Sequence, residues 1–479
     1  MKPLTEASFY ALLSEKFPHV PTAKQDLALR ALSGFLIRGN PGELFLLKGY
    51  AGTGKTTLLG TLIANLWHLR KKAVLMAPTG RAAKVMASYT GTAAHTIHRQ
   101  IYFPKKERGG GVRFTLAPNR HRDTIFIVDE ASMIPDNPTD TGPGNAGSLL
   151  DDLITFVYSG HKCMLVLIGD TAQLPPVRLS LSPALDAQRL ELQYGKTVVE
   201  LELDEVMRQA EGSGILMNAT RLREGIASEP LPEFRFALSG FSDVVRLVDG
   251  YEIQDAINES FDTYGKEETA LIVRSNKRAN LYNQNIRSRL LFLENELAAG
   301  DFLMVVKNNY FWLKSSSEAG FIANGDILEV LEIFAFKNLY GFHFAEVRVR
   351  MVDYPGQPAF ETVLLLDTLQ AESPALTYED NNRLYQEVMK DYEGERSGYK
   401  KFLSVKNNPY FNALQVKFSY AITCHKAQGG QWEQVFIEQP YLEGSPDRDY
   451  QRWLYTAVTR ARTRLFLIGF QSDFFLNGE

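Results

Sequence analysis

A glycine-rich stretch near the N-terminus carries the residues best suited to chemistry. Positions 49–56 read Gly-Tyr-Ala-Gly-Thr-Gly-Lys-Thr, which is a glycine, four residues and then Gly-Lys-Thr. This spacing is typical of a phosphate-binding loop, in which backbone N–H groups and a lysine surround phosphates while a threonine hydroxyl ligates Mg²⁺. The loop predicts a nucleoside triphosphate site formed by Gly52, Thr53, Gly54, Lys55, Thr56 and Thr57. The loop alone fits a kinase, a GTPase, a transporter ATPase or a helicase equally well.

A second chemical site is predicted where an apolar run, residues 125–128, ends in Asp129 and Glu130. An aspartate at such a strand end can share Mg²⁺ with Thr56, and the following glutamate can orient and deprotonate an attacking water. Another apolar run ends in Gly-Asp at positions 169 and 170 and is followed by Gln173. We expect Gln173 to lie where it can sense the γ-phosphate.

The elements that must position these residues alternate between strand and helix. Short apolar runs at 44–47, 73–76 and 125–128 are separated by helix-like segments, which predicts a parallel sheet with its sites at the carboxyl ends of the strands. The α/β rhythm starts again near residue 201. Between about 300 and 415 it gives way to short alternating runs separated by Gly, Asn and Pro, which favour an antiparallel, barrel-like insert.

A hairpin is predicted around the triple glycine at positions 109–111. Its arms interleave Lys and Arg with aromatic residues that include Phe103. Two interpretations stay open: a solvated charged hairpin, or a wedge that touches phosphates and stacks on bases.

Composition excludes some classes of protein. The chain has 479 residues, of which 45% are hydrophobic and 23% charged, as in ordinary globular proteins of several structural units. The net charge of −4 is unlike that of a wholly basic nucleic-acid binder, so DNA binding would need local basic patches. Two cysteines give neither a disulfide framework nor a zinc pattern. The absence of a long apolar run or leader predicts a cytoplasmic protein without a membrane partner.

Nine short strings occur in the order found in one family: GYAGTGKTT, APTGRAA, TIHR, IVDEASM, GDTAQLPPV, EVMRQ, SNKRAN, TCHKAQGGQW and LYTAVTRAR. The chain therefore resembles the superfamily 1 helicases, and within them the RecD/Dda-like branch. The resemblance implies an α/β fold with two RecA-like parallel-sheet domains. It assigns 1–200 to the first, with a pin hairpin at 97–122, and 201–299 with 416–479 to the second, which carries an SH3-like barrel at 300–415.

The resemblance also implies roles for single residues. Gln25, by itself either a surface amide or an adenine reader, resembles the adenine-reading glutamine. Arg208 and Arg460 resemble two arginine fingers, and Gln428 and Gly429 a loop that reaches the phosphates. Residues in strings that touch single-stranded DNA in the family, together with the hairpin aromatic, are Thr79, Thr96, His98, Phe103, Asn276, Thr423 and His425.

The implied function is an ATP-dependent DNA helicase and translocase that moves 5′ to 3′ on single-stranded DNA. Its cofactors would be ATP and Mg²⁺, and its partners single-stranded and tailed duplex DNA; we expect a monomer. The alternative is a motor subunit of a larger recombination or nuclease complex, switched by ATP and without unwinding of its own. One departure is Gln431, where many relatives have a glutamate.

Overall fold

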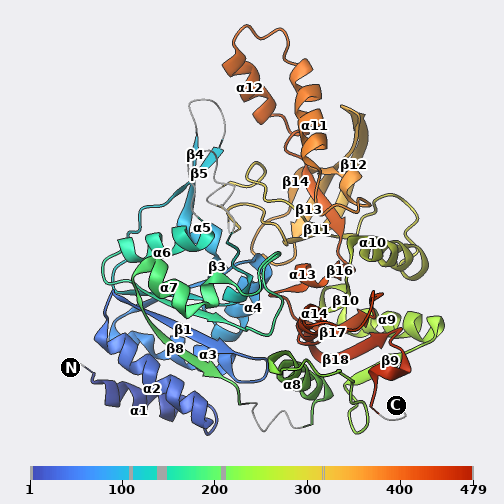
Figure 1. The fold of residues 1–479 in the computed structure, drawn as a ribbon. Helices are drawn as coiled ribbons and strands as arrows, with labels where there is room; N and C mark the ends of the chain where they lie inside the picture. The colour runs from blue at the N-terminus through green and yellow to red at the C-terminus, as the bar shows by residue number, and fades with distance from the viewer. Residues whose placement is uncertain are drawn as a thin grey trace.

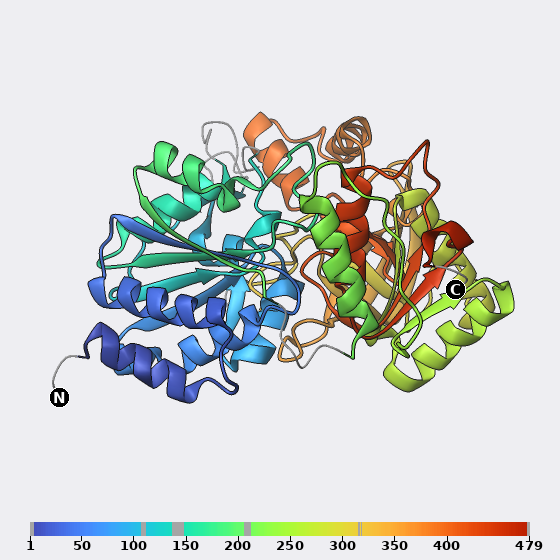
Figure 2. The same ribbon diagram turned by 60° about the horizontal axis from the view of Figure 1, so that its bottom comes forward.

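The structure is a computed structural model that describes residues 4–106, 112–136, 148–205, 212–314, 317 and 319–476. Figure 1 shows two α/β halves side by side, with a β-barrel and a pair of helices above them. Turned to bring the lower face forward, Figure 2 shows the two halves next to each other, each with helices packed against its strands.

The first half is built on a six-stranded parallel sheet in the order β3-β2-β6-β7-β1-β8. Its strands are β1 (Glu43–Gly49), β2 (Lys72–Ala77), β3 (Ala94–Thr96), β6 (Thr124–Val128), β7 (Met164–Gly169) and β8 (Thr197–Leu203). Every residue of β6 and β7 is buried, because helices cover both faces of the sheet. That double cover explains why these strands read as continuous apolar runs.

Among the described residues, the helices around this sheet are α1 (Glu6–Lys16), α2 (Ala23–Arg38), α3 (Lys55–Asn65), α4 (Gly80–Thr90), α5 (Ile97–Ile101), α6 (Leu149–Ser159) and α7 (Ala187–Tyr194). Helix α2 begins at a capping box, in which the Thr22 hydroxyl accepts from the Gln25 backbone and the Gln25 side chain accepts from the Thr22 backbone. It ends at Gly39, whose φ of 60° suits glycine. The cap fixes Gln25 directly beneath the phosphate loop.

The second half has a five-stranded parallel sheet in the order β16-β10-β17-β18-β9. Its strands are β9 (Val244–Leu247), β10 (Thr269–Val273), β16 (Ala421–Thr423), β17 (Trp432–Glu438) and β18 (Ala461–Ile468). Its helices are α8 (Gly214–Ala227), α9 (Gly250–Tyr264), α10 (Asn276–Asn285), α13 (Cys424–Ala427) and α14 (Arg448–Val458). Helix α14 leads into β18 through Thr459 and Arg460.

Between β10 and β16 the chain leaves this sheet to form a closed barrel of five strands. They are β11 (Phe302–Val305), β12 (Ile327–Leu339), β13 (Phe342–Met351), β14 (Phe360–Leu365) and β15 (Leu414–Phe418). Burial along β12 and β13 largely alternates, because one face fills the barrel and the other is solvated. The helices α11 (Tyr378–Lys390) and α12 (Gly398–Lys406) project from it, as Figure 1 shows in orange.

Helix α4 touches both the barrel and the second sheet. The Lys84 ammonium lies 3.3 Å from the carboxylate of Asp353, and the Arg81 guanidinium lies 4.0 Å from the ring centre of Trp432. At the start of the helix, a Cβ on Gly80 would lie 2.4 Å from Asp326 Oδ1, so a larger residue there would require the Asp326 side chain to shift. These contacts hold the two halves in a defined arrangement across the cleft described below.

The predicted fold class is confirmed: two parallel-sheet halves of the RecA-like kind and a small closed barrel insert. In the predicted pin, β4 (Tyr102–Lys106) pairs with β5 (Val112–Leu116) in antiparallel register. Its tip, 107–111, lies outside the described residues. The domain boundaries given above stay a prediction. Within the described ranges, no helix is long and apolar enough to cross a membrane.

Candidate functional site: a cleft between the two sheets

A cleft of about 670 Å³ opens at the carboxyl ends of β1, β6 and β7. Its floor consists of the phosphate loop and the acidic residues that follow β6. The opposite wall comes from the segment Thr459–Arg462 at the start of β18, in the second half. The cleft is therefore a shared site, which neither half forms alone.

The phosphate loop has the backbone that its glycines predict. Gly52 and Gly54 have φ values of 75° and 83°, a region that side chains with a Cβ rarely adopt. The Thr53 hydroxyl is turned inward, where it donates to the Tyr50 carbonyl at 2.8 Å. Lys55 donates its ammonium protons to the carbonyls of Gly49 and Tyr50, the latter at 2.8 Å. The lysine thus lies at the loop with its charge directed into it.

Gln25, predicted to read adenine, is 1% exposed and is not among the residues that line the cleft. Its carbonyl oxygen accepts from the Thr22 backbone at 3.0 Å, and its amide nitrogen donates to the Thr53 carbonyl at 2.9 Å. Both ends of the amide are therefore used to support the phosphate loop from below. The adenine contact stays a prediction.

The two acidic residues after β6 have different surroundings. Asp129 accepts the Glu130 backbone N–H at 2.8 Å on one oxygen and the Tyr89 hydroxyl at 2.7 Å on the other. Those two bonds fix the plane of its carboxylate. Glu130 has a left-handed backbone, φ 54°, which turns its side chain into the cleft. Burial raises the pKa of Glu130, and the positive charge of Arg460 opposes that rise.

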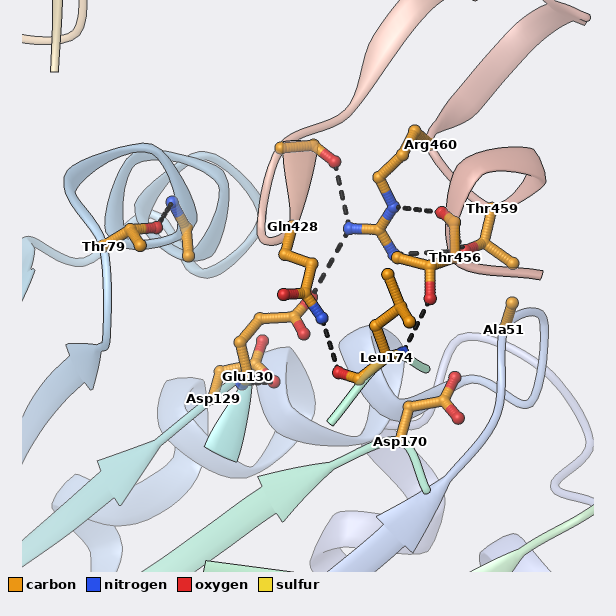
Figure 3. A network of polar contacts seen from close by, with 12 residues as sticks. Ala51, Thr79, Asp129, Glu130, Asp170, Leu174, Gln428, Thr456, Thr459 and Arg460 are labelled. Atoms are coloured by element: carbon orange, nitrogen blue, oxygen red, sulfur yellow. Dashed lines mark hydrogen bonds and ion pairs between the residues drawn. The ribbon is translucent and has the colours of Figure 1, made fainter. Parts of the chain in front are cut away.

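Arg460 reaches the cleft from the second half and is 3% exposed. Its guanidinium donates to the carbonyls of Thr456 and Gly430 at 3.0 and 3.1 Å and to the Thr459 hydroxyl at 3.1 Å. One of its nitrogens lies 4.0 Å from a Glu130 carboxylate oxygen, as Figure 3 shows. A fully held guanidinium directed at the acidic wall is suited to stabilising negative charge in the cleft.

The segment after β7 is held from both sides by the second half. The Gln428 amide donates to the Leu174 carbonyl at 2.7 Å, and the Thr456 hydroxyl accepts the Leu174 N–H at 2.8 Å (Figure 3). Directly before Leu174 lies Gln173, which lines the cleft. Its buried side-chain amide oxygen has no hydrogen-bond partner among the described residues. The Gln173 amide lies beside the phosphate loop, where its unpaired oxygen can accept a hydrogen bond from a water in the cleft.

The residues that follow Gln428 in the second half approach the first half closely. Gly429 has a φ of 73°, and a Cβ there would lie 2.8 Å from Ala82 and 3.2 Å from the Thr79 hydroxyl oxygen. Gln431, the departure noted in the sequence, lines the cleft itself. Gln428 and Gly429 do not line it, so their predicted contact with the phosphates stays a prediction.

The predicted DNA contacts on the first half have mixed accessibility. Thr79 and Thr96 cap α4 and α5, where their hydroxyls accept from Ala82 and Arg99 backbone N–H groups, each at 3.2 Å. Thr96 is only 4% exposed, so its side chain is enclosed by the protein. Burial lowers the pKa of His98 to about 4, which keeps its ring neutral at physiological pH. Phe103 is 40% exposed on β4.

On the second half, the predicted DNA contacts lie at neighbouring strand ends. Thr423 pairs with Val273 where β16 and β10 end. Asn276 begins α10, and its amide donates to the Glu372 carbonyl at 3.0 Å. His425 is exposed. The predicted arginine finger Arg208 lies outside the described residues, so only Arg460 of the two is placed.

Comparison with known proteins adds independent information. A family model described as an AAA domain matches residues 37–235, and one described as a UvrD-like helicase C-terminal domain matches residues 418–468. The ATP-dependent DNA helicase dda of Enterobacteria phage T4 is 24% identical, over 88% of this chain and 93% of that protein. The ATP-dependent RecD2 DNA helicase of Deinococcus radiodurans is 33% identical over 39% of this chain, a stretch that is 22% of that protein.

Together with the shared cleft, these matches support a superfamily 1 helicase of the RecD/Dda type. The resemblance inferred from the nine strings is thereby confirmed, and nucleotide binding follows from the family. A solved Pif1 helicase structure is 17% identical and covers 95% of this chain and 94% of that chain with a TM-score of 0.46. The fold itself rests on the two sheets and the barrel.

Sequence reasoning missed the residue that supports Asp129. Tyr89 lies near the end of α4, and burial next to Asp129 raises the pKa of its hydroxyl well above the ordinary value, so it stays a donor. A tyrosine followed by Thr-Gly at a helix end gives no chemical signal in a sequence. Only the tertiary structure shows that this hydroxyl lies at the Asp129 carboxylate.

Proposed function

We propose that this protein is an ATP-driven DNA helicase that translocates on single-stranded DNA and couples ATP hydrolysis to duplex unwinding. One observation carries the proposal: Arg460 of the second half points at Glu130 of the first, 4.0 Å away, in the same cleft as the phosphate loop. A site divided between two parallel-sheet halves responds to their relative movement. The two named relatives described above are ATP-dependent DNA helicases.

Each residue of the cleft then has a role in hydrolysis. The loop N–H groups and Lys55 bind the β- and γ-phosphates. Glu130 accepts a proton from the attacking water, for which its raised pKa suits it. Arg460 stabilises the charge that develops on the transferred phosphoryl group. The Gln173 amide N–H group can donate to the γ-phosphate, and its unpaired amide oxygen can accept from the attacking water.

The first half also offers ligands that fit Mg²⁺. This ion prefers oxygen ligands and keeps several waters, so one carboxylate and one hydroxyl from the protein suffice beside the phosphates. Thr56 and Asp129 supply such oxygens, and both line the cleft. When bound, Mg²⁺ would neutralise charge between the β- and γ-phosphates. The Tyr89 hydroxyl and the Glu130 N–H would keep the Asp129 carboxylate in a fixed orientation for it.

DNA would pass along the strand ends that carry Thr79, Thr423 and His425, beneath the barrel. Binding there relies on helix N-termini and local basic groups, because the whole chain carries a net charge of −4. DNA affinity should therefore fall as salt rises. The hairpin of β4 and β5, with Phe103 exposed, would separate the strands of the duplex.

The test is unwinding of duplexes that carry only a 5′ tail, only a 3′ tail, or no tail, each with ATP and Mg²⁺. We expect strand separation of the 5′-tailed duplex alone, and none with the variant Lys55→Ala. Unwinding of the 3′-tailed duplex alone would reverse the direction and leave the helicase assignment intact. No unwinding of any substrate would refute the helicase and favour an ATP-switched motor subunit.

A further inference from the structure

Helix α14 places a second side chain of the second half directly against the phosphate loop. Tyr455 is 1% exposed, and its hydroxyl accepts the backbone N–H of Ala51 at 3.0 Å. The same hydroxyl donates to a carboxylate oxygen of Asp170 at 2.6 Å. One phenol thus joins the loop after β1 to the strand end after β7, and it comes from a helix some 400 residues further along the chain.

Both hydrogen-bonding functions of this hydroxyl are committed. Burial beside Asp170 raises the pKa of Tyr455 well above its ordinary value, so the phenol stays protonated and donates. The other oxygen of Asp170 accepts the Ala172 N–H at 2.9 Å, which fixes the carboxylate that receives the proton. The two hydrogen bonds therefore run in one direction: Ala51 donates to the phenol, and the phenol donates to Asp170. A phenylalanine would fill the same space and make neither bond.

The neighbours of Tyr455 give this contact a functional setting. The next residue, Thr456, accepts the Leu174 N–H and also holds the Arg460 guanidinium through its carbonyl. One short segment, residues 455–460, therefore positions Arg460 and holds the segment after β7 that carries Gln173. Through Tyr455 it also holds the phosphate loop, whose N–H groups would surround the triphosphate. A movement of this segment changes all three contacts together.

We propose that Tyr455 is a positioning residue, which ties the phosphate loop to the second half so that the loop is set for hydrolysis only while Arg460 is in place. This inference rests on the proposed ATP-driven activity and deepens it. Hydrolysis then depends on the second half twice, through the charge of Arg460 and through the geometry of the loop. Binding of ATP to the loop depends on neither.

The same helix provides a matched control. Tyr450 is also 1% exposed and stacks on Trp453, with ring centres 6.1 Å apart, but its hydroxyl has no hydrogen-bond partner among the described residues. Tyr450→Phe removes the same atom from the same helix without breaking such a bond. Any loss seen only in Tyr455→Phe belongs to the bridge and not to packing of α14.

The experiment measures kcat and KM for ATP with saturating single-stranded oligothymidylate, together with ATP affinity without DNA. For Tyr455→Phe we expect kcat to fall about tenfold, as for loss of a hydrogen bond to a charged group, while KM and affinity stay within about twofold. Tyr450→Phe should match the wild type. Equal kcat values in wild type and Tyr455→Phe would overturn the proposal, and so would losses of kcat and ATP affinity in equal measure.

A double-mutant cycle with Asp170→Asn tests the partner. If the phenol acts through Asp170, the double variant should be no slower than the slower single variant; independent, multiplying losses would contradict the bridge. DNA stimulation of hydrolysis by the wild type distinguishes failure of the proposed function from failure of the role of Tyr455. If DNA does not stimulate its hydrolysis, the proposed function fails; if DNA does and Tyr455→Phe is unaffected, only this inference fails.

Discussion

The two walls of the nucleotide cleft are built in different ways. On the first half, the chemical groups come from one loop and one strand end, and the same half supports them: Gln25 holds Thr53, and Tyr89 holds Asp129. On the second half, Arg460 is held by the Thr456 carbonyl at the end of α14 and by the Gly430 carbonyl. Its guanidinium faces Glu130 across the cleft.

The two walls therefore differ in what each can do alone. The first wall has the lysine, the loop and the proposed metal ligands, so we expect it to bind ATP without the second half. The second wall adds a cation and holds the segment at Leu174 in place. It completes a site for the transition state. Affinity and turnover should therefore be separable by mutation.

The largest effect should come from breaking the first wall. Lys55→Ala removes the charge that binds the β- and γ-phosphates, so both ATP binding and hydrolysis should be abolished. Phosphate release and nucleotide titration measure the two. Lys48→Ala is the control, because Lys48 lies on β1 just before the loop and pairs with Glu200 at 2.5 Å. Near-normal turnover of Lys55→Ala would show that the site is wrongly placed.

Breaking the second wall should affect turnover alone. Arg460→Ala should lower kcat at least about 100-fold, as expected for a lost charge in the transition state, with ATP affinity within about threefold. The exposed Arg464, four residues further along β18, provides the matched control Arg464→Ala. If affinity falls as much as kcat, the arginine binds the ground state and the contrast between the walls is lost.

A smaller effect is expected where the second wall holds the segment after β7 that carries Gln173 and Leu174. Thr456→Val removes the hydroxyl that accepts the buried Leu174 N–H, so DNA-stimulated kcat should fall about fivefold. Thr456→Ser keeps the hydroxyl and should restore most of the rate. The measurement is kcat for the two variants, which should be higher for Thr456→Ser than for Thr456→Val. Identical rates would mean that this contact has no part in turnover.

The smallest effect is a shift in pH dependence that reports contact between the walls. Glu130 must be ionised to accept a proton, so activity falls as the pH falls through its pKa, which burial raises above the ordinary carboxyl range. Arg460 opposes that rise, so removal of its charge should move the acid limb of kcat/KM to higher pH. Arg460→Lys, which keeps the charge, should leave the limb in place. Unchanged limbs in both variants would mean that the two groups do not interact.

Much of the first wall was predictable from the sequence. The phosphate loop and the Asp-Glu pair are local patterns, and their chemistry dictates their spacing. The two parallel-sheet halves and the barrel were predictable as well, because doubly covered strands give continuous apolar runs and half-solvated strands give alternating ones. The order of strands within each sheet was not predicted.

The second wall was predictable only through the family resemblance. Tyr455 and Thr456 act on residues some 280 to 400 positions away, and nothing local marks a tyrosine or threonine as a partner of a distant backbone group. The structure also gives two predicted site residues an additional role. Thr96 caps α5 from a buried position, and Gln25 uses its amide to hold the phosphate loop. Both roles depend on tertiary packing that a motif does not encode.

Hydrolysis should require both walls of the cleft, whereas ATP binding should require only the first. The most direct measurement is ATP hydrolysis by the wild-type protein with and without single-stranded DNA, alongside ATP affinity under the same two conditions. We expect DNA to raise kcat strongly and to change ATP affinity little, because DNA bound across both halves would bring the second wall onto a nucleotide already held by the first. Equal kcat values with and without DNA would contradict it.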